Sequence, residues 1–143
     1  MSIPLTATYL LRFDGGSNPN PGPCAGSYVI YNENKEVVAE GGKFIENGTN
    51  NIGEYTGLLA GLERCYVLGI TNVNVEGDSM LVISQVTGKW KINHQHLRDL
   101  CEKVRGTVKL LNRVSFSHIK REYNGHADRL SDQTLERKCD WEI

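Results

Sequence analysis

The order of strand-like and helix-like segments is the feature that most restricts how this chain can fold. Three segments with strand-like alternation come first. A helical segment, a short strand, two more helical segments, a strand and a last helical segment follow. This order predicts an α/β mixed sheet with helices on both faces and an antiparallel arrangement of the first three strands. The expected strands are 6–13, 27–31, 37–44, a short one through Val73 and Val75, and 113–119; the expected helices are about 51–68, a short one from Ser79 through Ile83, about 97–111 and about 124–138.

Two stretches rich in Gly, Asn and Pro separate these segments. Residues 15–23 are typical of a loop after the first strand, and residues 47–51 of a turn and helix-cap cluster. The chain has 143 residues, which suffices for one ordinary hydrophobic core but not for two. We therefore expect a single domain over 1–143, with its core at about 6–138.

Composition excludes several classes of protein. No apolar run approaches the ~20 residues of a membrane-spanning helix, and the polar N-terminus does not resemble a signal peptide. We expect a soluble, intracellular monomer, cytoplasmic or nuclear, that makes no contact with a membrane and has no obligatory protein partner. The cysteines are too far apart for a zinc site or a redox pair and are expected to be reduced and mostly buried: Cys24, Cys65, Cys101 and Cys139.

The charges are distributed unevenly along the chain. The net charge is −1, which argues against a protein that coats nucleic acid electrostatically. Residues 1–80 carry four basic and nine acidic side chains, whereas residues 81–143 carry twelve basic and eight acidic ones. This asymmetry suits a cation-dependent site beside a phosphate track, and ordinary solvated surface charge explains it equally well.

Four acidic residues occupy the ends of predicted elements. Asp14 and Asp78 each follow an apolar strand, and ligands gather at such carboxyl ends in open α/β sheets. Glu54 and Asp128 fall in the first turns of two predicted helices. If the first and fourth strands are adjacent and parallel, all four carboxylates converge on one patch. Each acid also has an ordinary explanation as a turn, capping or helix-terminal residue.

Converging carboxylates imply bound cations. Four such groups would raise each other's pKa unless positive charge lay among them. Two Mg²⁺ ions, with Mn²⁺ as a substitute, fit an all-oxygen ligand set, and a pair of metals supports phosphodiester hydrolysis without a nucleophilic Ser or Cys. The four acids therefore predict a two-metal nuclease site.

The residues that flank the four acids resemble the motifs of a known family. The ordered motifs of this chain resemble type 1 ribonuclease H over the whole length, and the short stretch between Val86 and Leu97 resembles members without the basic protrusion. The motifs are Phe13-Asp14-Gly15-Gly16-Ser17, Asn20-Pro21-Gly22-Pro23, Thr49-Asn50-Asn51-Ile52-Gly53-Glu54-Tyr55, Glu76-Gly77-Asp78-Ser79 and Arg121-Glu122-Tyr123-Asn124-Gly125-His126-Ala127-Asp128.

The resemblance implies a ribonuclease H-like fold with a five-stranded sheet in the order 3-2-1-4-5. It also implies hydrolysis of the RNA strand of RNA–DNA hybrids, leaving 5′-phosphate and 3′-hydroxyl ends. Asp14 would bridge both metals, Glu54 and Asp78 would complete one metal site, and Asp128 would hold the other. The matching positions for substrate contacts are Gly15, Asn20, Thr49, Asn50, Asn51, Met80, Trp90 and Asn93.

Some of these substrate residues keep a second interpretation. The asparagines are also ordinary turn and cap formers, Trp90 is also a candidate for a partly buried core residue, and Met80 for an ordinary helix residue. The chain lacks the His that some members carry in a mobile loop before the last acid. An auxiliary role for His126 is the nearest substitute, although His126 lies only two residues before Asp128.

The chain departs from the family pattern at three places. Pro19 and Gly53 stand where relatives often have Gly and Ala, and residues 24–27 alter the usual run of small residues. Two other functions remain open: a DNA nuclease or strand-transfer enzyme of the same fold, and a hybrid-binding module without activity.

Overall fold

A computed structural model describes residues 6–143. Six strands form one sheet in the order β5-β4-β1-β2-β3-β6. Strands β1, β2 and β3 are antiparallel neighbours, whereas β4 and β5 run parallel to β1. The elements are β1 (Thr8–Ser17), β2 (Gly22–Tyr31), β3 (Val37–Gly48), α1 (Asn50–Val67), β4 (Asn72–Gly77), α2 (Met80–Val86), α3 (Gln95–Val108), β5 (Arg113–His118), the 3-10 helix η1 (Arg121–Tyr123), α4 (Gly125–Arg137) and β6 (Trp141–Glu142).

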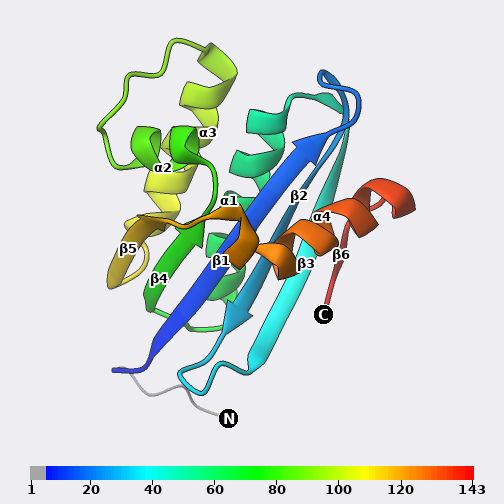
Figure 1. Ribbon diagram of the computed structural model, residues 1–143. Helices are drawn as coiled ribbons and strands as arrows, with labels where there is room; N and C mark the ends of the chain where they lie inside the picture. The colour runs from blue at the N-terminus through cyan, green and yellow to red at the C-terminus, as the bar shows by residue number, and fades with distance from the viewer. Residues whose placement is uncertain (1–5) are drawn as a thin grey trace.

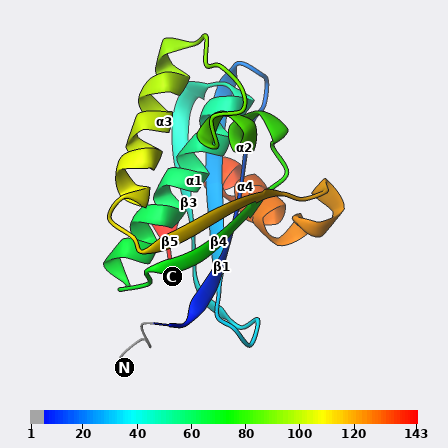
Figure 2. The same ribbon diagram turned by 90° about the vertical axis from the view of Figure 1, so that its left-hand side faces the viewer.

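The fold confirms the predicted α/β class and the strand order 3-2-1-4-5. Helices cover both faces of the sheet: α1 and α3 lie on one face and α4 on the other (Figures 1 and 2). The main core fills the space between the sheet and α1, where Leu11, Phe13, Tyr55, Leu58 and Leu62 are fully buried. Cys24, Cys65 and Cys101 are buried and Cys139 is exposed, and all four thiols are free. In the described part of the chain, no helix is long and apolar enough to cross a bilayer.

The sequence interpretation was wrong at three element boundaries. Strand β1 continues through Ser17 and β2 begins at Gly22, so the predicted loop 15–23 shrinks to the four residues between them. Strand β3 likewise extends to Gly48, into the expected turn cluster. The sixth strand was not predicted; its two residues pair with Gly41 and Gly42 at the edge of β3. Glycine and asparagine are poor strand formers, and ladder pairing overrides that preference here.

Glycines allow β1 and α1 to approach at the level of the backbone. A Cβ atom built on Gly15 would lie 2.1 Å from the carbonyl carbon of Gly53, and one built on Gly53 would lie 2.6 Å from the carbonyl oxygen of Ala25. Side chains do not fit at either position. The contact therefore places the first turn of α1, with Glu54, directly against the end of β1, with Asp14.

This contact predicts an unusual effect of Gly53→Ala. Helix propensity alone would make the change stabilising by about 1 kcal/mol. Because the new methyl group meets backbone atoms that cannot rotate away, we expect a net destabilisation of about 1–3 kcal/mol instead. The free energy of unfolding from urea titration measures the effect.

Gly106→Ala is the matched control. Gly106 lies on α3, and a Cβ atom there would meet nothing within 4 Å. The control should show the stabilisation that helix propensity predicts. Stabilisation by Gly53→Ala as well would contradict the close contact between β1 and α1.

Candidate active site

Adjacent parallel strands bring Asp14 and Asp78 together. In the ladder between β1 and β4, Phe13 pairs with Gly77, and the residue that follows each of them along the chain is one of these acids. Asp14 continues within β1 opposite Ser27 of β2, whereas Asp78 begins the turn that leads into α2. Both carboxylates therefore lie side by side toward the carboxyl ends of two adjacent parallel strands, as the sequence predicted.

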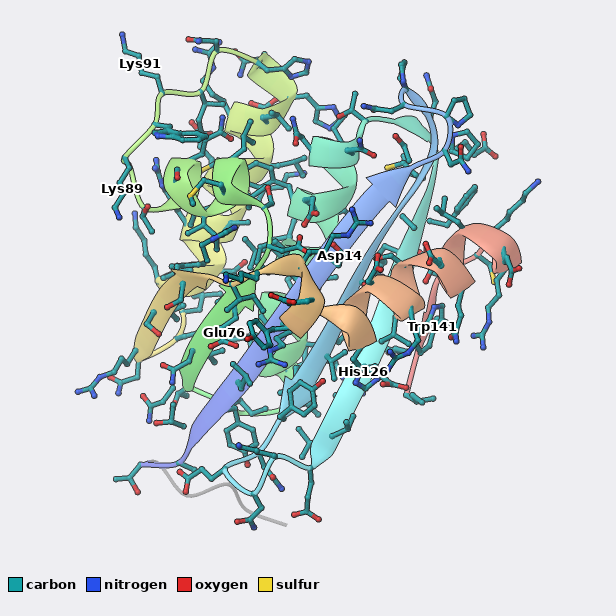
Figure 3. The ribbon with its side chains drawn as sticks, viewed as in Figure 1. Asp14, Glu76, Lys89, Lys91, His126 and Trp141 are labelled. Carbon is teal, nitrogen blue, oxygen red and sulfur yellow. The ribbon has the colours of Figure 1, made fainter. Side chains whose placement is uncertain are left out.

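Two helices supply the other acids. Thr49 caps α1 by accepting a hydrogen bond from Ile52 N at 3.2 Å, and Glu54 follows near the start of the helix. Carboxylate oxygens of Asp14, Glu54 and Asp78 lie within 4.8 Å of one another. Asp128, from the first turn of α4, lines the same cavity, which has a volume of about 510 Å³. Figure 3 shows Asp14 in the middle of the sheet, beside the junction of η1 and α4.

The environment of these acids disfavours their charged forms. Burial raises the pKa of Asp14 to about 7, and the nearby charges of Asp78 and Asp128 act in the same direction. Burial and the charge of Asp14 raise the pKa of Glu54 well above its usual range. Two acids with raised pKa values in one cavity are typical of a functional site, because burying charge without compensation destabilises the fold.

Polar neighbours offset part of this effect at Asp78. Burial raises its pKa, while the Asn124 side chain and the charge of Arg121 act in the opposite direction. Arg121 lowers the pKa of Glu54 in the same way. It is the basic residue that lines this cavity, and one positive charge does not balance the acids around it.

The donor set fits divalent cations. Glu54 is 8% exposed, and its Oε2 atom is buried without a hydrogen-bond partner among residues 6–143. A buried carboxylate oxygen without a partner is costly unless it ligates an ion. Three convergent carboxylates offer only oxygen ligands, which Mg²⁺ and Mn²⁺ accept. Asp14, Glu54 and Asp78 can hold one cation, and Asp128 adds oxygens on the α4 side of the cavity.

Predicted substrate residues from β1, the β1–β2 turn and the start of α1 lie in or beside this cavity. Gly15 and Asn50 line it. The side-chain atom Asn50 Oδ1 accepts a hydrogen bond from Ser17 N at 2.8 Å, and Asn20 Oδ1 accepts one from Asn50 N at 3.1 Å. These asparagines thus tie the turn to α1, so their alternative role as turn formers is also realised. Asn51 lies half-buried in the first turn of α1.

The remaining substrate candidates lie outside the acid cavity. Met80 begins α2, two residues after Asp78, and is 47% exposed. Trp90 is 50% exposed and lines a separate cavity of about 290 Å³ with Arg98 and Arg105 of α3. Asn93 is exposed in the irregular segment before α3. Trp90 is therefore a surface residue and does not belong to the core.

His126 points away from the acid cavity and has partners on β2 and β3. Its Nδ1 atom lies 2.9 Å from the Tyr31 hydroxyl, and its Nε2 atom lies 3.0 Å from Glu40 Oε2. Figure 3 shows His126 on the side of α4 away from Asp14. Two residues apart on a helix correspond to about 200° of rotation, so His126 and Asp128 face opposite ways. His126 does not line the acid cavity.

The sequence analysis missed two charged residues of the cavity, Asp132 and Arg121, as well as several uncharged ones. Asp132 lies one helical turn after Asp128, and the i, i+4 spacing on α4 was the signal that could have found it. Burial and the charge of Asp128 raise the pKa of Asp132. Arg121 belongs to η1, and no spacing in the sequence places it in the cavity.

Sequence comparisons identify known proteins that are similar to this chain. A family model described as reverse transcriptase-like matches residues 12–134. The bifunctional protein Rv2228c of Mycobacterium tuberculosis is 35% identical over 128 residues, and ribonuclease HI of Halobacterium salinarum is 38% identical over 124. These matches cover 89% and 87% of this chain. The chain spans only 35% of the mycobacterial protein and 62% of the halobacterial one.

Solved structures superpose closely on the chain. The N-terminal RNase H domain of Rv2228c matches with a TM-score of 0.89 and 34% identity, covering 93% of this chain and 96% of that one. RNase H1 of Halobacterium salinarum matches with a TM-score of 0.88 and 36% identity, covering 91% and 98%. LC11-RNase H1, solved in complex with an RNA/DNA hybrid, matches with a TM-score of 0.85 and 29% identity, covering 90% and 97%.

Proposed function

Since this chain belongs to the type 1 ribonuclease H family, we propose that it is a metal-dependent nuclease that hydrolyses the RNA strand of RNA–DNA hybrids. The products would carry 5′-phosphate and 3′-hydroxyl ends. One observation carries the proposal: Asp14, Glu54 and Asp78 converge within 4.8 Å, and Asp128 lines the same cavity.

The four acids are the proposed metal ligands and catalytic residues. Asp14 would be shared by two ions, Glu54 and Asp78 would complete one site, and Asp128 would hold the second. Bound Mg²⁺ or Mn²⁺ would supply activation of the attacking water and stabilisation of the leaving oxygen. The chain itself orients the carboxylates through the β1–β4 ladder and the glycine contact with α1. The raised pKa of Asp14 reflects negative charge that the protein does not balance, and a bound cation would supply that balance.

Selectivity for a hybrid would come from the β1–β2 turn and the start of α1. The side-chain Oδ1 atoms of Asn20 and Asn50 already accept hydrogen bonds within the protein. Their side-chain Nδ2–H groups are the donors that remain for an RNA 2′-hydroxyl, which DNA lacks. Thr49 and Asn93 are the proposed contacts to a phosphate of the DNA strand, with Asn51, Met80, Gly15 and Trp90 along the same track. Recognition of this kind reads duplex shape and sugar rather than base sequence.

A gel assay with labelled duplexes tests the proposed substrate. We expect cleavage of the RNA strand of a hybrid with Mg²⁺ or Mn²⁺ and none with a chelator. Duplex DNA of the same sequence should be cut at least about tenfold more slowly, because two lost 2′-hydroxyl contacts of about 1 kcal/mol each suffice for that ratio. Double-stranded RNA keeps these hydroxyls, and its cleavage should be slower because its duplex shape differs from that of a hybrid.

The same assay separates the alternatives. Preferred cutting of duplex DNA would overturn the substrate assignment in favour of another nuclease of this fold. Binding of hybrid without any metal-dependent cleavage would indicate a non-catalytic module instead.

A further inference from the structure

The junction that leads into Asp128 is held by the sheet rather than by the helix it starts. Asn124 is the N-cap of α4, and its side chain makes no capping hydrogen bond. Its Nδ2 atom instead donates to the carbonyl oxygen of Phe13 at 2.9 Å, and Asn124 is 1% exposed. The first turn of a helix without a side-chain cap frays readily. Something else must fix the position of Asp128.

Contacts from β2 and β3 supply that fixation. The Ser27 hydroxyl donates to the carbonyl oxygen of Ala127 at 2.6 Å and lies 2.7 Å from the Ser131 hydroxyl. Ser27 is 0% exposed and Ser131 is 3% exposed, so water does not compete for these hydrogen bonds. We call Ser27, Tyr31 and Glu40 the α4 anchor.

The second half of the α4 anchor acts through His126. Because the Glu40 carboxylate can only accept, His126 Nε2–H donates to it, and in the neutral ring Nδ1 accepts from the Tyr31 hydroxyl. These contacts fix the side of α4 that faces away from the cavity. Asp128 lies on the opposite side of the same turn, so holding His126 sets the rotation of the helix about its axis.

Hydrogen bonds next to Asp14 and Asp128 connect the strand that carries the first acid to the helix that carries the second. Ser27 is the direct partner of Asp14 in the β1–β2 ladder. The atom that Ser27 holds, Ala127 O, belongs to the residue before Asp128, and the atom that Asn124 holds, Phe13 O, belongs to the residue before Asp14. Small shifts of α4 would therefore change the separation of Asp14 and Asp128 directly.

We propose that Ser27, and Tyr31 acting through His126, are positioning residues that hold Asp128 at the distance from Asp14 that a shared pair of cations requires. The inference rests on the proposed function, because it assumes that Asp128 is a metal ligand. Partners that orient metal ligands typically matter about 10–100-fold for metal affinity. The anchor does the same for a ligand by fixing the helix that carries it.

Single-atom deletions in the full chain test the proposal. Ser27→Ala and Tyr31→Phe each remove one hydroxyl and keep the rest of the side chain. We expect each to raise the half-saturating Mn²⁺ concentration about tenfold, both in calorimetric titration of the metal-free protein and in hybrid cleavage. At saturating Mn²⁺ the cleavage rate should recover most of the wild-type value. Tm in the presence of chelator records the loss of stability separately.

Two controls separate positioning from general destabilisation. Trp141→Phe removes the hydrogen bond from Trp141 Nε1 to Thr134 Oγ1 at the other end of α4, and Ser115→Ala removes the one from Ser115 Oγ to Asn74 on β4. Both should lower Tm without changing the Mn²⁺ requirement. Equal Mn²⁺ shifts in controls and anchor variants, or no shift in the anchor variants, would overturn the proposal. A wild-type chain that neither binds Mn²⁺ nor cleaves hybrid would overturn the proposed function itself.

Discussion

Asp78→Asn is expected to lower the rate of hybrid cleavage by at least about 10³-fold, because a bound cation contributes several kcal/mol to the stabilisation of developing charge. The substitution keeps the size of the side chain and one oxygen, so the fold should persist. Its effect is confined to the charge that holds a cation beside Asp14 and Glu54. Single-turnover cleavage of a labelled hybrid at fixed Mg²⁺ measures the rate, and binding of the hybrid should remain.

Asp140→Asn provides the matched control. Asp140 is exposed and accepts a hydrogen bond from Phe44 N, which an asparagine oxygen can also accept. This variant should cleave at the wild-type rate. Full activity of Asp78→Asn would rule out the proposed role of the acid cavity, whatever the substrate.

The second large effect concerns stability without metal. The pKa of Asp14 is raised from 3.8 to about 7, so the folded protein binds this proton more tightly than the unfolded chain does. Asp14 therefore stabilises the fold fully below about pH 4, and this contribution is lost as pH rises to about 7. Such a pKa difference corresponds to a free energy on the order of 4 kcal/mol.

Asp14→Asn isolates this contribution, since asparagine stays neutral at every pH. In chelator, the unfolding free energies of wild type and variant should agree near pH 4, and the variant should be the more stable protein near pH 8. Urea titrations at several pH values provide the measurement. The raised pKa values of Glu54 and Asp78 should leave a smaller slope of the same sign in the variant.

Adding Mg²⁺ or Mn²⁺ should reverse the order at pH 8. Cations stabilise the charged wild-type site by mass action, whereas the variant has lost a shared ligand. A wild type that shows no pH-dependent deficit in chelator, and no gain on adding metal, would contradict both the raised pKa of Asp14 and the proposed metal site.

The sheet was predictable from the sequence because hydrophobic periodicity determines element type. Three strands in succession and the later alternation of helix and strand predicted a mixed sheet with an antiparallel start, and the family resemblance implied the order 3-2-1-4-5, which the structure confirms. The extension of β1 through Gly15 and Gly16 was not predictable in this way. The residues that look like a loop form a strand because α1 packs against backbone that carries no side chains.

The acid cavity was likewise predictable from the sequence only in part. The sequence predicted Asp14, Glu54, Asp78 and Asp128 from their places at element ends and from the resemblance, and the structure places all four on one cavity. Their catalytic roles and the substrate contacts remain predictions. Arg121 was missed because a 3-10 turn, which has no repeat in the sequence, brings it to the cavity, and the direction of His126 depends on the rotation of α4.

The glycine contact between β1 and α1 also bears on how this protein tolerates mutation. At that point no side chain lies between the strand that carries Asp14 and the helix that carries Glu54. A change of rotamer or the loss of a methyl group therefore cannot alter the distance between strand and helix there. The spacing of these two acids is a property of the main chain. Substitutions elsewhere in the core can accumulate without moving them apart, whereas in this chain a side chain at Gly15 or Gly53 would require the strand and the helix to separate.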